Sequence, residues 1–273
     1  MYRLLIISLV LVSLGCARQK SNVVIAGSTS VEPFVEKLAG QFREENHAVV
    51  IDVQGGGSTA GIEATCNGSC NIGTSSRNLK PSEQGLKVFI ISYDGIAIIV
   101  NKANPVDNLT EEELRGLFSG EITNWQKVGS PRPSPRSGGS NSKIIPVTRE
   151  EGSGTRGAFE DLIMGKEAIS DACLVQDSNG AVREIIANTP AGIGYISAGL
   201  VDERVRALKI DGIAPTTENF LSKKYKFVRP FLLLTKDEPT GSVKQFIDYI
   251  LSPAGQNTLK KDGLIPVQGE NER

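Results

Sequence analysis

The 273-residue sequence predicts an α/β fold built from parallel β-α-β units. Short apolar runs that predict buried strands alternate along the chain with stretches whose apolar residues recur at helical spacing. The composition agrees, because 29 glycines and only 5% aromatic residues suit a turn-rich α/β architecture better than a coiled coil. A chain of this length has room for one large domain or two compact lobes.

The N-terminal part predicts two strands that each lead through a glycine-serine turn into a helix. The apolar run from Val23 to Ala26 predicts a buried strand, and the turn Gly27-Ser28-Thr29-Ser30 follows it. Ser30 is expected to cap the next helix, which carries Pro33 in its first turn. Residues 49–53 predict a second strand, which ends in the turn Gly55-Gly56-Gly57-Ser58-Thr59.

Further strands and helices follow in the same alternation. Residues 72–77 predict a short strand with a polar exit, and the apolar runs 89–91 and 96–100 predict strands on either side of Tyr93-Asp94-Gly95. The proline- and serine-rich segment 131–142 predicts a surface loop. The remaining elements are a helix after the capping residue Thr110, strands over 144–147, 191–196 and 231–234, and a helix from Ser242.

A third strand-to-helix turn, Arg149-Glu150-Glu151-Gly152-Ser153-Gly154-Thr155-Arg156-Gly157, has the composition of an anion site. The helix after it is expected to carry Phe159, Leu162 and Ile163 on one face. Backbone N–H groups at a helix start meet the positive end of the helix dipole, which favours negative ligands. Arg149 adds a permanent charge, and the hydroxyls of Ser153 and Thr155 add donors. We expect the three turns to converge on one small oxyanion.

Other kinds of site fit these turns less well. Gly152-x-Gly154-x-x-Gly157 matches the dinucleotide-binding pattern in form, but no acidic residue at the end of a second strand suits a ribose. No glycine turn continues as Gly-Lys-Ser/Thr, and Ser153 does not stand in Gly-x-Ser-x-Gly. The single histidine, His47, lies in a polar run where a solvated position is expected. The sequence therefore predicts a binding protein without a cofactor rather than an enzyme.

The N-terminus predicts an export signal. Residues 1–15 combine a basic start with an apolar run, which is shorter than the ~20 residues of a spanning helix. Cys16 after a small residue resembles a lipoprotein signal, in which this cysteine carries the lipid; the alternative is an ordinary secretory signal. Residues 16–22 then form a polar tether. The net charge of −1 offers no basic excess for nucleic acid, so a lipid anchor is the expected membrane contact.

Cys66 and Cys70 flank a turn-forming Asn-Gly pair. In the oxidising space outside the cytoplasm they either close a small loop as a disulfide or remain two half-buried thiols. With one histidine and no second pair of closely spaced cysteines, no metal site is expected.

Several motifs together resemble the phosphate-binding proteins of bacterial phosphate-specific ABC transporters, which are type II periplasmic binding proteins. The motifs are GSTSV at 27–31, GSTAG at 57–61, IGTSSR at 72–77, REEGSGTR at 149–156, the segment 109–125 and PAGIGYI at 190–196. The resemblance implies two α/β lobes, each a mixed, mostly parallel sheet flanked by helices, joined by two crossing hinge strands. It implies a first lobe of residues 22–99 with 231–273 and a second lobe of residues 100–230.

The resemblance also implies that the ligand lies in the cleft between the lobes. The expected contacts are Ser28, Thr29, Ser30, Ser58 and Ser76 from the first lobe and Arg149, Ser153, Gly154 and Thr155 from the second. Some family members carry an aspartate where this chain has Ser76, and that aspartate accepts the proton of hydrogen phosphate. Asp94, beside the expected hinge, is the expected substitute; the alternative is that it pairs with Arg77.

The implied function is high-affinity binding of inorganic phosphate outside the cytoplasmic membrane and delivery to the permease of an ABC transporter. The protein is expected to be a monomer, lipid-anchored at the outer face of the membrane or in the periplasm. Two alternatives stay open. One is a receptor for another tetrahedral oxyanion, such as sulfate, molybdate or tungstate, and the other is a phosphoester-processing enzyme that uses the same anion turns.

Overall fold

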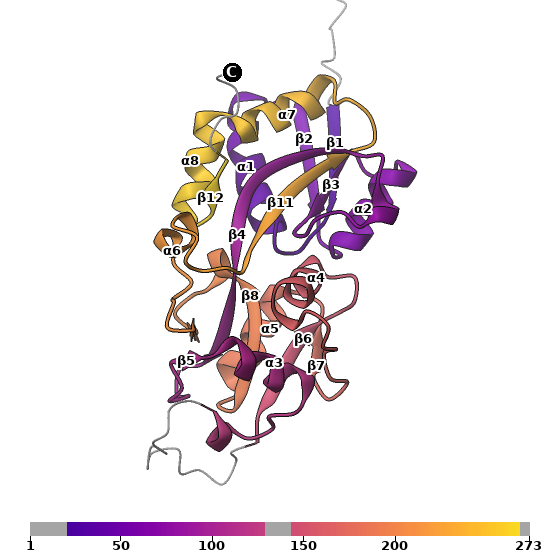
Figure 1. Cartoon of the computed structure of the whole chain (residues 1–273). Helices are drawn as coiled ribbons and strands as arrows, with labels where there is room; N and C mark the ends of the chain where they lie inside the picture. The colour runs from indigo at the N-terminus through magenta and orange to yellow at the C-terminus, as the bar shows by residue number, and fades with distance from the viewer. Residues whose placement is uncertain (1–20, 129–142, 268–273) are drawn as a thin grey trace, which may run out of the picture.

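A computed structural model describes residues 21–128 and 143–267 of the chain (Figure 1). The predicted export signal at 1–15, Cys16 and the predicted loop at 131–142 lie outside these residues. The described chain forms two α/β lobes, one above the other in Figure 1, as the resemblance implied.

Strands and helices alternate along most of the described chain, as the sequence predicts. The strands are β1 (Ser21–Gly27), β2 (Val49–Gln54), β3 (Ile72–Ser75), β4 (Lys87–Asn101), β5 (Asn108–Leu109), β6 (Ile145–Arg149), β7 (Leu174–Gln176), β8 (Gly192–Ser197), β9 (Val205–Ala207), β10 (Lys209–Ile210), β11 (Val228–Thr235) and β12 (Ile265–Pro266). The α-helices are α1 (Glu32–Glu45), α2 (Ser58–Asn67), α3 (Glu111–Ser119), α4 (Gly154–Phe159), α5 (Asn179–Asn188), α6 (Thr217–Leu221), α7 (Gly241–Leu251) and α8 (Pro253–Lys261).

One ladder of strands connects the two lobes. Its order is β2-β1-β3-β11-β4-β8-β6-β7, with β9 and β12 also paired to β4. The strands inside each lobe pair in parallel, β1 with β2 and β3, and β6 with β7 and β8. The pairs that β4 and β11 make are antiparallel. The sheet is therefore mixed, and its antiparallel part lies where the chain crosses between the lobes.

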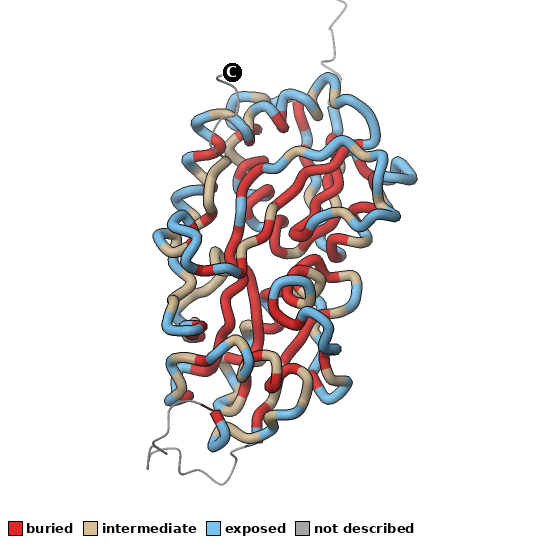
Figure 2. Tube along the Cα trace, in the orientation of Figure 1, coloured by how far each residue is buried: buried red, intermediate tan, exposed pale blue. Residues whose placement is uncertain are grey.

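The core of the first lobe joins α1, α7 and α8 to the sheet. Helix α1 contributes the apolar residues Phe34, Val35, Leu38 and Phe42, whose spacing places them on one face. The ring of Phe42 meets that of Phe246 edge-on, with 5.3 Å between centroids. Helices from opposite ends of the chain thus share one core, and Figure 2 shows buried residues inside both lobes and along the strand that connects them.

The core of the second lobe is built around three aromatic rings. Phe159 stacks on Tyr195 with 4.0 Å between centroids, and Phe118 meets Phe159 edge-on at 4.8 Å. Helix α3 begins as predicted, because the Thr110 hydroxyl accepts the backbone N–H of Glu113 in a capping box. These rings join α3, α4 and β8, and the Tyr195 hydroxyl lies 2.6 Å from Thr148 Oγ1 and accepts the N–H of Arg149 at 3.3 Å, so they support the end of β6.

Strand β4 crosses between the lobes without a break. Two strands separated by Tyr93-Asp94-Gly95 were expected, and this was wrong, since β4 is one strand of fifteen residues. The ladder passes directly from β11, where Val228 lies opposite Gly95, to β8, where Ser197 lies opposite Ile96. Gly95 permits close packing here, because a Cβ atom would lie 2.2 Å from the ring of Phe220. The lobe bounds expected at 99/100 and 230/231 stay a prediction.

Two local expectations differ from the structure. Ser30 does not cap α1, because the N-cap residue is Val31 and no side chain caps this helix. Leu162 is 38% exposed, whereas Phe159 and Ile163 are buried. The chain widens after α4 into a π-helical turn (Glu160–Met164), and this changes the spacing on which the predicted face depended.

The described cysteines are free thiols, so the expected alternative of a Cys66–Cys70 disulfide is not what the structure holds. Cys66 is exposed near the end of α2, whereas Cys70 is buried with its sulfur 3.5 Å from the Thr65 hydroxyl. Cys173 is buried in the second lobe, and burial raises the pKa of its thiol to about 11.

Candidate functional site

The predicted contact residues come together where the two lobes meet. The first lobe supplies the ends of β1 and β3 and the start of α2, and the second supplies the end of β6 and the start of α4. All of these residues are buried except Thr29, which is partly exposed. The expected convergence of three strand-to-helix turns is therefore present.

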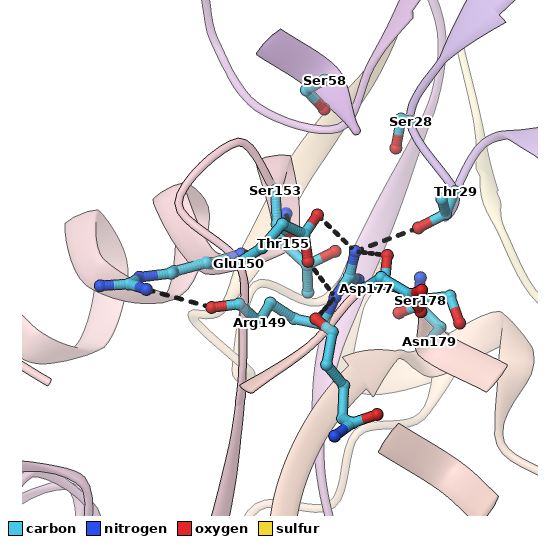
Figure 3. Close-up of polar contacts among 12 residues, drawn as sticks. Ser28, Thr29, Ser58, Arg149, Glu150, Ser153, Thr155, Asp177, Ser178 and Asn179 are labelled. Atoms are coloured by element: carbon cyan, nitrogen blue, oxygen red, sulfur yellow. Dashed lines mark hydrogen bonds and ion pairs between the residues drawn. The ribbon is translucent and has the colours of Figure 1, made fainter. Parts of the chain in front are cut away.

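Arg149, the last residue of β6, lies between the lobes with only 1% of its surface exposed. Its Nε donates to Glu150 and to the carbonyl of Gln176, both at 3.1 Å. Its Nη2 donates to the carbonyl of Asp177 at 2.7 Å and, across the lobe boundary, to the Thr29 hydroxyl at 3.2 Å (Figure 3). Its Nη1 is buried and has no hydrogen-bond partner. An open donor on a buried, permanent cation favours an anionic partner.

The hydroxyls of Ser30 and Thr155 meet across the cleft, with 2.8 Å between the oxygen atoms. Ser30 also accepts two hydrogen bonds, from the Asn179 side chain at 2.9 Å and from Arg229 Nη2 at 3.2 Å. A hydroxyl oxygen has two lone pairs and one hydrogen. Since both lone pairs accept, the Ser30 hydrogen points to Thr155, and the hydrogen of Thr155 is left for another acceptor.

Three further serines of the first lobe form one hydroxyl cluster. Ser28 Oγ accepts the N–H of Ser30 at 3.2 Å and donates to Ser76 Oγ at 2.9 Å. Ser58 Oγ accepts the N–H of Ser76 at 3.0 Å and lies 3.5 Å from its hydroxyl. Ser76, which stands where some family members carry an acid, is thus part of a chain of hydroxyl groups.

Ser153 forms the start of α4. Its hydroxyl accepts the backbone N–H groups of Thr155 at 3.2 Å and Arg156 at 3.3 Å, which makes it the N-cap of this helix. The helix start is held in place locally by this cap, and the hydroxyl hydrogen of Ser153 remains available as a donor.

The backbone of the second lobe touches the serines of the first at Gly154. A Cβ atom at this position would lie 2.1 Å from Ser58 Oγ and 2.6 Å from Ser76 Oγ. Nearby, the N–H of Thr59 donates to the carbonyl of Gly152 at 3.1 Å. The two lobes are therefore closed on each other around the site, and a glycine is required for this approach.

Asp94 pairs with Arg229 and not with Arg77. Its Oδ2 accepts Nε at 3.1 Å and Nη2 at 2.9 Å, and its Oδ1 accepts the Ser197 hydroxyl at 2.8 Å. Arg77 pairs instead with Glu83, at 2.7 and 2.8 Å. Burial raises the pKa of the Asp94 carboxyl, and the ion pair with Arg229 acts in the opposite direction. The expected role of Asp94 as acceptor of a ligand proton stays a prediction, and the ligand would have to replace one of these contacts.

Sequence reasoning missed Arg229 and Asn179. Arg229 is 2% exposed and reaches Ser30 from β11. The signal for it is a lone charge in an otherwise apolar strand. Asn179 begins α5 after β7, a fourth strand-to-helix junction. Strand β7 is short and its Leu174 and Val175 are exposed, so it leaves no buried apolar run in the sequence.

The arrangement can hold a desolvated tetrahedral anion. Hydroxyl hydrogens, the open Nη1 of Arg149 and the starts of α2 and α5 all supply positive charge or donors. Among residues 21–128 and 143–267, no group of three His, Cys, Asp or Glu side chains could hold a metal ion. The same residues include no helix with the length and apolar character needed to cross a membrane.

A family model of the PBP superfamily domain matches residues 15–254. The phosphate-binding protein PstS of Bacillus subtilis is 33% identical over 93% of this chain and 83% of its own length. PstS of Borreliella burgdorferi is 30% identical over 93% of this chain and 94% of its own length.

Solved structures of similar proteins have the same fold. A putative phosphate ABC transporter substrate-binding protein from Clostridium perfringens, with bound phosphate, is 41% identical to this chain and superposes with a TM-score of 0.84. The match covers 91% of this chain and 100% of that protein's chain. An ABC-type phosphate transport receptor from Vibrio cholerae is 37% identical with a TM-score of 0.71, covering 90% of this chain and 100% of its own.

Proposed function

We propose a function from one premise: this chain belongs to the PBP superfamily and, within it, to the phosphate-binding proteins of ABC phosphate transporters. It binds inorganic phosphate between its lobes and delivers the ion to the permease of an ABC transporter. Proteins of this fold release their ligand when the lobes separate, so a closed site and an open site are two states of one binding cycle.

The observation that carries the proposal is the open Nη1 of Arg149. This group is buried at 1% exposure, and the other donors of the same guanidinium are already engaged by Glu150 and backbone carbonyls. Burying such a donor without a partner costs free energy, so its environment favours a ligand oxygen there. A dianion supplies that oxygen and meets the surrounding hydroxyl hydrogens without a counter-cation.

The proposed phosphate contacts divide between the lobes. The first lobe contributes Ser28, Thr29, Ser30, Ser58 and Ser76, and the second contributes Arg149, Ser153, Gly154 and Thr155. Arg149 supplies charge, the hydroxyls supply donors, and the Gly154 position supplies a backbone N–H at a helix start. Arg229 and Asn179 join this set through their bonds to Ser30.

Calorimetry on protein stripped of phosphate tests the proposal. Phosphate should bind with one site per chain, and arsenate should compete because it shares the tetrahedral shape and protonation. Sulfate and molybdate should bind much more weakly. Tighter binding of sulfate or molybdate than of phosphate would favour the alternative of a receptor for another oxyanion.

The enzyme alternative has no support among the described residues. A phosphoester-processing enzyme needs a nucleophile with an activating base or a metal ion. His47 is exposed on the surface, and the hydrogen bonds of the Ser153 hydroxyl are those it accepts from the backbone of α4, not a bond to a base. Turnover of a phosphoester by the purified protein would contradict a purely binding function.

We further propose export of a monomer that is anchored by lipid at Cys16. The basic start, the apolar run and the small residue before the cysteine support this proposal. Mass spectrometry of the N-terminal peptide from the native host should find diacylglycerol on Cys16. An unmodified Cys16 in the mature chain would indicate an ordinary secretory signal instead.

A further inference from the structure

A buried ion pair that the sequence does not reveal lies beside the proposed anion site. Arg229 and Asp94 are 2% and 1% exposed, and they stand opposite each other on the two strands that cross between the lobes. The guanidinium also lies over the ring of Phe231, 5.4 Å from its centroid. The pair therefore sits at the junction of both lobes.

Asp94 is held by donors from the crossing strand β11 and from β8 of the second lobe. Arg229 donates twice to Oδ2, and the Ser197 hydroxyl of the second lobe donates to Oδ1. Neither carboxylate oxygen is without a donor, so the group acts as the counter-ion of Arg229 in this closed arrangement.

Arg229 in turn determines how Ser30 can bond. Its Nη2 donates to Ser30 Oγ at 3.2 Å, and its Nη1 donates to the Ser76 carbonyl at 3.4 Å. Together with the bond from Asn179, this occupies both lone pairs of Ser30. A hydroxyl in that state can donate its hydrogen but can accept nothing more.

We propose that Arg229, with Asp94 as its counter-ion, is a positioning residue that fixes Ser30 as a hydrogen-bond donor. Ser30 donates its one hydrogen to Thr155 in this arrangement, which leaves the Thr155 hydrogen for the ligand, and Ser30 itself cannot accept a hydrogen bond from a ligand hydroxyl. On this side of the cleft the ligand therefore meets a hydroxyl hydrogen, and an ionised oxygen accepts that hydrogen bond more strongly than a protonated one. The inference rests on the proposed function, because it assigns specificity within the same anion site.

A double-mutant cycle on the full chain tests whether Arg229 acts through Ser30. Arg229→Lys keeps the charge beside Asp94 but loses the fork that reaches both Asp94 and Ser30. We expect it to weaken phosphate binding about tenfold, and Ser30→Ala to do the same. The double variant should be within about twofold of the weaker single variant, because the second change removes nothing further. If the double variant loses as much affinity as the product of the two single-variant losses, the two residues act independently and the inference is overturned.

Arg204→Lys is the matched control for this cycle. Arg204 is exposed and pairs with Asp202 and Glu184, none of which is a proposed contact, so its variant should bind phosphate like the original protein. If the original protein binds no tetrahedral oxyanion, the proposed function fails. If it binds phosphate but the cycle is multiplicative, only the role of Arg229 fails.

Asp94→Asn provides a second test of the inference. It replaces the double-mutant cycle if Arg229→Lys does not fold. Phosphate and sulfate affinities, measured by competition, should change in the same direction, with their ratio held within about twofold. A counter-ion acts on both dianions alike, whereas an acceptor of the ligand proton acts on phosphate alone. Weaker phosphate binding with stronger sulfate binding would assign the acceptor role to Asp94 and overturn the inference.

Discussion

Arg149→Ala should abolish tight phosphate binding. The change removes the buried guanidinium whose Nη1 has no hydrogen-bond partner, and with it the positive donor that we assign to the anion. Truncating one partner of a buried, hydrogen-bonded charge pair costs about 2–5 kcal/mol, which is roughly thirty- to several-thousandfold in Kd. Calorimetry on phosphate-stripped protein measures this loss.

Arg204→Ala serves as the control, because it removes an arginine that is 43% exposed and pairs only with surface acids. Thermal unfolding without phosphate shows whether Arg149→Ala keeps its fold once the carbonyls of Gln176 and Asp177 lose their donor. An unchanged Kd in a folded Arg149→Ala protein would remove Arg149 from the site.

Gly154→Ala should prevent the lobes from closing. The added Cβ would stand 2.1 Å from Ser58 Oγ and 2.6 Å from Ser76 Oγ, which belong to the opposite lobe. Overpacking of this kind costs about 1–3 kcal/mol, and a cleft held open also separates the donors of the two lobes, so phosphate affinity should fall up to roughly a hundredfold. Each lobe keeps its own core, so thermal unfolding of the ligand-free protein should change little.

Gly152→Ala is a matched control from the same turn. A Cβ there would meet nothing closer than the Thr59 Cβ at 3.8 Å, an ordinary contact, so affinity should stay near the original. Small-angle scattering with saturating phosphate should show a closed protein for Gly152→Ala and a more open one for Gly154→Ala. Equal affinities in the two variants would contradict the closed geometry as the binding state.

Local patterns in the sequence predict much of the fold. The apolar stripe of α1, the capping box at Thr110 and the strand at Val23 to Ala26 depend on neighbours within a few residues, and each is present. Ser30 shows where such patterns mislead. A serine before a helix is a good cap by propensity, but here its hydroxyl is drawn into bonds with Asn179, Arg229 and Thr155.

By itself the sequence determined that three glycine-serine turns follow strands and precede helices, and that Arg149 stands in one of them. Those features are local, and their chemistry already indicated an anion. The tertiary structure decided which groups complete the site, because Arg229 and Asn179 reach Ser30 over 199 and 149 residues of chain. It also decided that Asp94 faces Arg229 and not Arg77. The pairing of these charges depends on how β4 and β11 cross between the lobes. The spacing of residues along the chain does not reveal that pairing.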